Sequence, residues 1–107
     1  MGHIVTEPRE GCIASAMEII GYKWTALIVR DLFVGPKRFS ELQQSVEGVN
    51  PRTLTQRLRI LEEHNIISKA HFKEVPPRTE YRLTSKGQDL WPIVQQMSKW
   101  GAKYQSV

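Results

Sequence analysis

Apolar residues recur at intervals of three and four along most of the chain, the spacing that places them on one face of an α-helix. Glycine and proline interrupt this pattern at Gly21, at Gly35-Pro36 and at Gly48, where we expect turns. Ser40 is expected to cap the third and shortest helical segment. The pattern as a whole predicts helices over about residues 12–20, 24–34, 41–46, 51–63 and 85–104.

The fourth segment has the clearest design. Asn50-Pro51 is a strong helix start, because Asn can cap free backbone N–H groups and Pro at the first helical position loses no hydrogen bond. Leu54, Leu58 and Leu61 then define one buried stripe. Stepping 100° per residue places the polar side chains Arg52, Gln56 and Arg59 on the opposite face, with Thr53 and Thr55 on its two shoulders.

Two β-strands are expected after this helix, where the period of the pattern changes. Residues 66–72 and 79–83 read as strands, and the connection 73–78 contains two prolines that stiffen an extended tip. A two-stranded hairpin that follows a helix-turn-helix is called a wing. The sequence therefore predicts a mainly α fold with a small β-wing, a winged helix-turn-helix domain over residues 12–107, preceded by a flexible arm at residues 1–11.

The last helix has a longer apolar stripe than a terminal helix of a small domain needs. We expect Thr84 to cap this helix, and Gly87 to weaken its first turn. Such a stripe can cover the domain's own core, or it can pack on a second copy of the chain. The stripe consists of Leu90, Ile93, Val94, Met97, Trp100 and Tyr104.

Composition and charge narrow the choice of partner. The chain has 107 residues, of which 40% are hydrophobic and 24% charged, as in a folded soluble domain. Its net charge is +4, and residues 37–82 alone contain nine basic and six acidic residues. This balance favours an anionic partner. One cysteine, no signal peptide and no long apolar run lead us to expect a cytoplasmic protein with no intrachain disulfide and no membrane partner.

The basic residues are placed as double-stranded DNA would require. Arg can read guanine and Gln adenine from the major groove, so the outward face of the fourth helix is suited to base contacts. Lys37, Arg38 and Ser40 precede or open the third helix, and Lys73 and Arg78 flank the wing tip, where phosphates could be met. Arg57 and Arg82 are expected to be ordinary surface charges. The candidate DNA-binding residues are Lys37, Arg38, Ser40, Arg52, Thr53, Thr55, Gln56, Arg59, Lys73 and Arg78.

The sequence gives no support for catalysis. The three histidines lack metal-ligand spacing, and the chain contains no phosphate-binding glycine loop and no G-x-S-x-G motif. We therefore expect no enzyme activity, no metal and no cofactor. Cys12 is the one chemically distinctive residue, because a thiol at the start of a helix can be activated by the helix dipole; it can equally be a packing residue.

Several blocks together resemble the HxlR family of bacterial and archaeal winged helix-turn-helix regulators, which are related to MarR proteins. The resemblance covers residues 12 to about 101. It rests on Cys12 and on the blocks IGYKWT (20–25), RDL (30–32), GPKRFSEL (35–42), PRTLTQRL (51–58), EVPPR (74–78) and YxLT (81–84).

The resemblance implies a homodimeric regulator, expected to be a repressor, that binds a pseudo-palindromic operator. It also implies dimer contacts through the N- and C-terminal helices, and a cysteine at position 12 that some members use to sense oxidants or electrophiles. Tyr22 departs from the family's more usual glycine, and the absence of a second cysteine excludes a two-cysteine switch within this sequence. The expected dimer residues are Ile13, Met17, Ile93, Met97, Trp100 and Tyr104.

Two other functions remain open. A regulator could respond to a small ligand in an apolar cleft near Trp24, Trp91 and Trp100, without redox chemistry. A winged helix could instead dock an acidic protein partner, although its outward face here lacks the aromatic anchors typical of protein interfaces.

Overall fold

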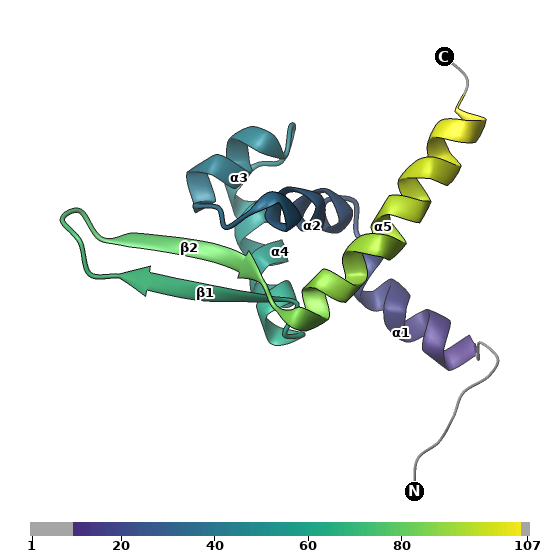
Figure 1. Ribbon diagram of the computed structural model, residues 1–107, viewed down its shortest axis with the longest axis horizontal. Coiled ribbons are helices and arrows are strands. Elements are labelled where there is room, and N and C mark those ends of the chain that lie inside the picture. Colours follow the sequence, from purple (N-terminus) through teal and green to yellow (C-terminus); the bar gives the residue numbers. More distant parts are fainter. Residues whose placement is uncertain (1–9, 106–107) are drawn as a thin grey trace, which may run out of the picture.

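The chain folds as five helices with an antiparallel hairpin inserted before the last of them (Figure 1). The computed structural model describes residues 10–105. Its elements are α1 (Glu10–Ile20), α2 (Thr25–Val34), α3 (Phe39–Ser45), α4 (Pro51–Glu63), β1 (Ile67–Phe72), β2 (Arg78–Leu83) and α5 (Ser85–Tyr104). This order confirms the predicted winged helix-turn-helix, and the strand limits differ from the prediction by one residue.

The hydrophobic core lies where α2, α3 and α4 meet the base of the hairpin. The leucine stripe of α4 is fully buried there, as its spacing predicted. Gly48 makes the turn between α3 and α4 with a φ of 90°, a conformation that favours glycine. The buried apolar residues are Ile28, Val29, Leu32, Leu42, Val46, Val49, Leu54, Leu58, Leu61, Ile66, Ile67, Leu83 and Val94.

The wing is joined to the helical part by its second strand. Ile67 pairs with Leu83 at the base and Phe72 with Arg78 near the tip. Lys37, just before α3, forms an isolated bridge with Tyr81: the Lys37 N–H donates to Tyr81 O at 3.0 Å, and the Tyr81 N–H donates to Lys37 O at 2.8 Å. The approach to α3 therefore fixes the direction in which the wing projects.

The start of α5 is fastened to the end of α4. The hydroxyl of Thr84 accepts from the Gly87 N–H at 3.1 Å and donates to the carbonyl of Asn65, and Lys86 Nζ donates to the carbonyl of His64 at 2.9 Å. A side chain at Gly87 would collide with the carbonyl of Ile66. Gly87 is thus required by close packing, a role beyond the predicted weakening of this helix end.

Two predicted boundaries were wrong. Ser40 does not cap α3: the helix starts at Phe39, and the Glu41 carboxylate accepts from the backbone N–H of Arg38 at 2.8 Å. Glu41 makes the capping contact because its carboxylate reaches back across the first turn to the free N–H of Arg38. The arm predicted for residues 1–11 ends earlier, because Glu10 and Gly11 belong to α1; residues 1–9 lie outside the described part.

The outer helices diverge from the body on the side away from the wing (Figure 1). The molecule is consequently broad and thin, with principal extents of 51 × 48 × 23 Å. Among residues 10–105 no single helix is long and apolar enough to cross a bilayer. The helical stretches Gly11–Ile20 and Thr25–Val34, which meet at 71°, reach that threshold only as a pair.

Candidate nucleic-acid interface

Helix α4 presents a polar face whose direction is fixed by its own sequence. Asn50 Oδ1 accepts from the Thr53 N–H at 2.8 Å, so the helix starts at the predicted residue. Leu54, Leu58 and Leu61 anchor one side in the core. Because a helix cannot rotate without exposing that stripe, the opposite side must face outward.

Four of the predicted residues come together on that outward side. Arg52, Thr55, Gln56 and Arg59 are exposed and line one open hollow of about 330 Å³. Thr55 Oγ1 donates to the carbonyl of Pro51 at 2.8 Å, which leaves the oxygen able to accept. Thr53 does not line this hollow; it is half-buried on the other shoulder of the helix. The hollow therefore offers guanidinium and amide groups to one ligand surface.

The residues just before α3 and in its first turn add polar groups that differ in exposure. Arg38 and Ser40 are exposed at the start of α3. Lys37 is half-buried, because its backbone is paired with the wing strand. Arg38 and Ser40 are thus accessible for phosphate contacts, and Lys37 is less so.

The two predicted wing cations differ. Lys73 is exposed beside the tip. Arg78 is held inside the wing: its Nη2 lies 3.3 Å from Glu74 Oε1, its Nε lies 3.8 Å from Glu80 Oε2, and its guanidinium carbon lies 4.3 Å from the centre of the Phe72 ring. Arg78 therefore braces the hairpin in the free protein, and Lys73 is the more available cation.

Ion pairs engage only some of the basic residues in the described part of the chain, and the outward cations are not among them. Within residues 10–105, the ion pairs join Arg30 to Asp31, Lys69 to Glu62, and Arg78 and Arg82 to the wing carboxylates. In the same range no ion pair involves Lys37, Arg38, Arg52, Arg59 or Lys73. These five cations are thus free for an anionic ligand, whereas Arg78 and Arg82 are paired within the hairpin and Lys69 joins the hairpin to α4.

Arg57 was predicted to be a surface charge, and this was wrong. It is half-buried on the flank of α4, with its guanidinium carbon 3.9 Å from the centre of the Tyr22 ring. Its Nη1 is buried and has no hydrogen-bond partner in the described part of the chain. The one available signal was Tyr22 itself, a large aromatic residue at a position where the resemblance leads us to expect glycine.

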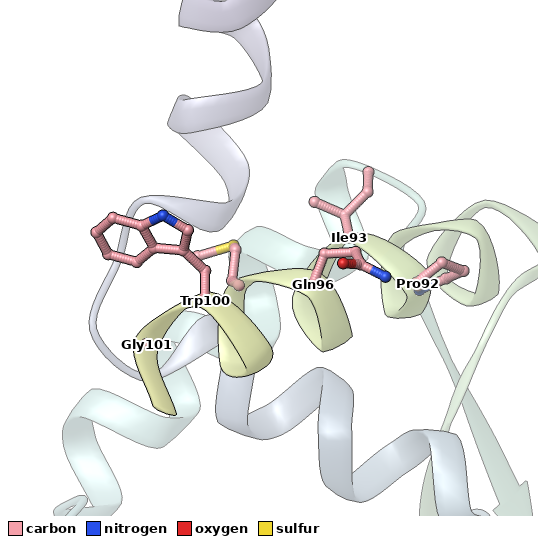
Figure 2. Close-up of a pocket in the computed structure, with 6 residues that line it drawn as sticks. Pro92, Ile93, Gln96, Trp100 and Gly101 are labelled. Atoms are coloured by element: carbon pink, nitrogen blue, oxygen red, sulfur yellow. The ribbon is translucent and has the colours of Figure 1, made fainter. Parts of the chain in front are cut away.

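A second surface, on α1 and α5, is apolar. We call the exposed residues of this surface the outer apolar face: Ile13, Met17, Ile93, Met97, Trp100 and Tyr104, each between 47% and 69% exposed. Pro92, Ile93, Gln96, Met97, Trp100 and Gly101 line an open groove of about 800 Å³ along α5. Figure 2 shows Ile93 and Trp100 standing on the same side of that helix. Within the single chain, the stripe of α5 does not serve mainly as a core cover.

The remaining candidates occupy separate places. Cys12 is a free, exposed thiol in the first turn of α1. The three tryptophans do not share one cleft: Trp100 lines the groove on α5, Trp91 stacks on Phe33 at 5.0 Å, and Trp24 lies against Gly48 at the α3–α4 turn.

Comparison with known proteins places this arrangement among transcriptional regulators. Residues 19–107 match the model of the HxlR-like helix-turn-helix. The HTH-type transcriptional regulator YdeP of Bacillus subtilis (strain 168) is 40% identical over 96 residues, covering 89% of this chain and 75% of the relative.

Two solved structures are similar over most of their length. The oxidized form of the redox regulator HypR has a TM-score of 0.84 at 36% identity, covering 89% of this chain and 98% of HypR. The reduced form of the regulator YodB from B. subtilis has a TM-score of 0.80 at 31% identity, with coverages of 92% and 95%. Both similarities support the fold and the type of regulator.

Proposed function

The chain belongs to the HxlR-like helix-turn-helix family, and from this membership and the geometry of α4 we propose that it binds a pseudo-palindromic DNA operator as a homodimer. It is a transcriptional regulator of the HxlR/MarR type and not an enzyme, as its relatives are regulators. We propose repression as the outcome, because a dimer that covers about two turns of operator blocks access to the DNA beneath it.

The observation that carries this proposal is the outward face of α4. Arg52 and Arg59 are exposed there without a carboxylate partner in the described chain, and Gln56 lies between them. Arg and Gln side chains are long enough to reach base edges from a helix in the major groove. Lys73, Lys37, Arg38 and Ser40 would contact the phosphates on either side.

The outer apolar face supports the homodimer. Its six residues are large, exposed and contributed by two helices that lead away from the DNA-reading part. Pairing two such faces about a two-fold axis would remove them from water and present two α4 helices. Two reading helices about 34 Å apart match successive major grooves on one side of the duplex.

Operator binding can be tested directly by fluorescence anisotropy, using a duplex selected from genomic fragments by the wild-type protein. We expect tight binding that weakens steeply with salt, and a stoichiometry of two chains per duplex. Failure to enrich any genomic fragment would contradict the proposal, as would a stoichiometry of one chain.

A control variant guards against nonspecific binding by a basic protein. Lys99→Ala removes one positive charge from the side of α5 that faces away from the outer apolar face, and it should leave operator affinity unchanged. Arg52→Ala removes the same charge from α4 and should weaken it.

We also propose that Cys12 is the site of a redox signal. Its thiol is exposed in the first turn of α1, whose apolar residues Ile13 and Met17 belong to the outer apolar face. Two structurally similar proteins are HypR, a redox regulator, and YodB, which has been studied after diamide treatment. A modification of Cys12 would thus act next to the dimer contacts and change the relative placement of the two α4 helices of the dimer.

The chemistry available to a single cysteine is thiol–disulfide exchange. The thiolate Sγ of Cys12 attacks one sulfur of a low-molecular-weight disulfide, a new S–S bond forms, and the other half leaves as a thiolate. A reducing thiol reverses the step. A bridge between the two Cys12 residues of a dimer would form by a second exchange, in which the partner thiolate displaces the small thiol.

Oxidised glutathione would test this proposal. We expect it to add one small thiol, or a chain-to-chain disulfide, per Cys12 by mass spectrometry, and to release operator DNA in an anisotropy titration. Cys12→Ser should keep the operator under the same treatment. Loss of DNA by the Cys12→Ser variant would refute the redox role.

A role as a protein-docking module is disfavoured by the outward face of α4. It consists of Arg, Gln and Thr without an aromatic anchor. The aromatic side chains in which many protein interfaces concentrate their binding energy are absent from this face.

A further inference from the structure

The turn between α1 and α2 touches the helix-turn-helix at two points. Trp24 lies beside the α3–α4 turn, where a side-chain carbon placed on Gly48 would be 3.4 Å from Trp24 Cη2. Tyr22 lies under the middle of α4, with its ring centre 3.9 Å from the guanidinium carbon of Arg57. This short turn therefore spans from one end of α4 to its centre.

The main interaction of the Arg57 guanidinium is with the ring of Tyr22. The Nη1 of Arg57 is buried and has no hydrogen-bond partner in residues 10–105. A cation over the face of a tyrosine ring is attracted by the negative potential of the ring; Tyr22 is 46% exposed, so the attraction is that of a partly solvated pair. The contact therefore favours one placement of the Arg57 side chain, which extends from the middle of α4 to the Tyr22 ring.

Arg57 lies on the flank of α4, between the buried leucine stripe and the outward face. The residues that line the outward hollow are Arg52, Thr55, Gln56 and Arg59, and Arg57 is not among them. Its charge is consequently turned towards the protein and is not presented with the outward cations.

We infer that Tyr22 is a positioning residue for DNA binding, which acts through Arg57 to limit small displacements of α4 within the orientation that its buried leucine stripe sets. This inference rests on the proposed operator binding. It connects the turn between α1 and α2 mechanically to α4. A displacement of α1 would reach the outward face through this contact.

Operator affinity across four variants tests the inference. Tyr22→Phe keeps the ring and should bind the operator as the wild type does. Tyr22→Leu loses the ring face and should bind about two- to fivefold more weakly, because the competent placement of α4 becomes less populated. In an Arg57→Met background, Tyr22→Leu should have no further effect. Because Tyr22→Leu changes no charge, the salt dependence of binding should keep its slope.

Hydrogen exchange on the free protein supplies a readout that needs no DNA. We expect the amides of α4 to exchange faster in Tyr22→Leu and at the wild-type rate in Tyr22→Phe. Lys23→Met is the matched control: Lys23 is exposed in the same turn, with its Nζ 4.6 Å from the Trp24 ring, and its loss should leave α4 exchange unchanged.

The possible results separate this inference from the function on which it depends. If the wild-type protein bound no duplex, operator binding would be refuted. The hydrogen-exchange data would still show whether the contact between Tyr22 and Arg57 stabilises α4. If the wild type bound but Tyr22→Leu matched it in affinity and exchange, the positioning role would be refuted. An effect of Tyr22→Leu that persisted in the Arg57→Met background would refute it as well.

Discussion

Helices α4 and α5 each leave one broad side uncovered, and the two sides have opposite chemistry. On α4 the apolar residues are buried and the uncovered side shows Arg52, Gln56 and Arg59. On α5 the buried residues are Gly87 and Val94, and the uncovered side shows Met97 and Trp100.

The difference shows that amphipathic spacing alone does not identify a surface. Both helices have an apolar stripe at helical period, but only the stripe of α4 is fully buried in the core of the same chain. A polar side left over suits a polar, anionic partner, and an apolar side left over suits a second apolar surface. The two sides therefore predict different partners. A mutation on one side should abolish its interaction without affecting the interaction of the other side.

The largest expected effect comes from a charge on the apolar side. Met97→Glu should convert the dimer to monomer at micromolar concentration, because pairing two such faces would bury two carboxylates at a cost of at least about 3 kcal/mol. Sedimentation velocity measures the species directly. Gln96→Glu, in the same groove, adds the same charge at a position that is already polar and should leave most of the dimer. A Met97→Glu protein that remained dimeric would show that the outer apolar face is not the interface.

The next effect concerns the polar side. Arg52→Ala should weaken operator binding by about 1–3 kcal/mol and relax the preference at one base pair of each half-site. The dimer should persist, since Arg52 is far from the outer apolar face. Anisotropy titrations with the operator and with single-base variants measure both quantities. Unchanged affinity would mean that this side of α4 does not enter the groove.

A smaller effect is expected at the wing. Lys73→Ala should weaken binding to the operator and to unrelated duplexes equally, and should reduce the slope of the salt dependence by about one. The reason is that a phosphate contact contributes affinity without reading sequence. Titrations at several salt concentrations give the slope. A loss confined to the operator would instead indicate a base contact from the wing.

The smallest effects concern the caps of the two helices. Asn50→Ala should lower the free energy of unfolding by about 1 kcal/mol, because it removes the acceptor for the Thr53 N–H. Thr84→Ala should cost more, since its hydroxyl both caps α5 and donates to the end of α4. Urea denaturation of both variants measures the difference. Equal losses would indicate that the contact from α5 to α4 adds nothing to the cap.

Most of the fold could be predicted from local signals. Asn50-Pro51, Gly48 and the two prolines of the wing act within a few residues, and each was placed correctly. The gathering of Arg52, Thr55, Gln56 and Arg59 in one hollow also follows from helical period alone.

The errors arose where a residue is defined by a partner distant in sequence. Gly87 is required by the carbonyl of Ile66, and Arg57 is placed by the ring of Tyr22, neither of which a periodicity can show. Arg78 is a different case: its phosphate contact stays a prediction, and in the free protein its near neighbours Glu74 and Glu80 hold it within the hairpin. Ser40 was a local error, in which the longer Glu41 side chain captured the free N–H.

The central claim is that two copies of the outward side of α4 enter the major groove together, and selection from a random DNA library tests it most directly. We expect the wild-type protein to enrich two inverted half-sites whose centres lie about 10 base pairs, or a multiple of that spacing, apart. The Arg52→Ala protein should lose the preference at one position in each half-site. Enrichment of a single isolated site, or of the same sequences by both proteins, would contradict the account.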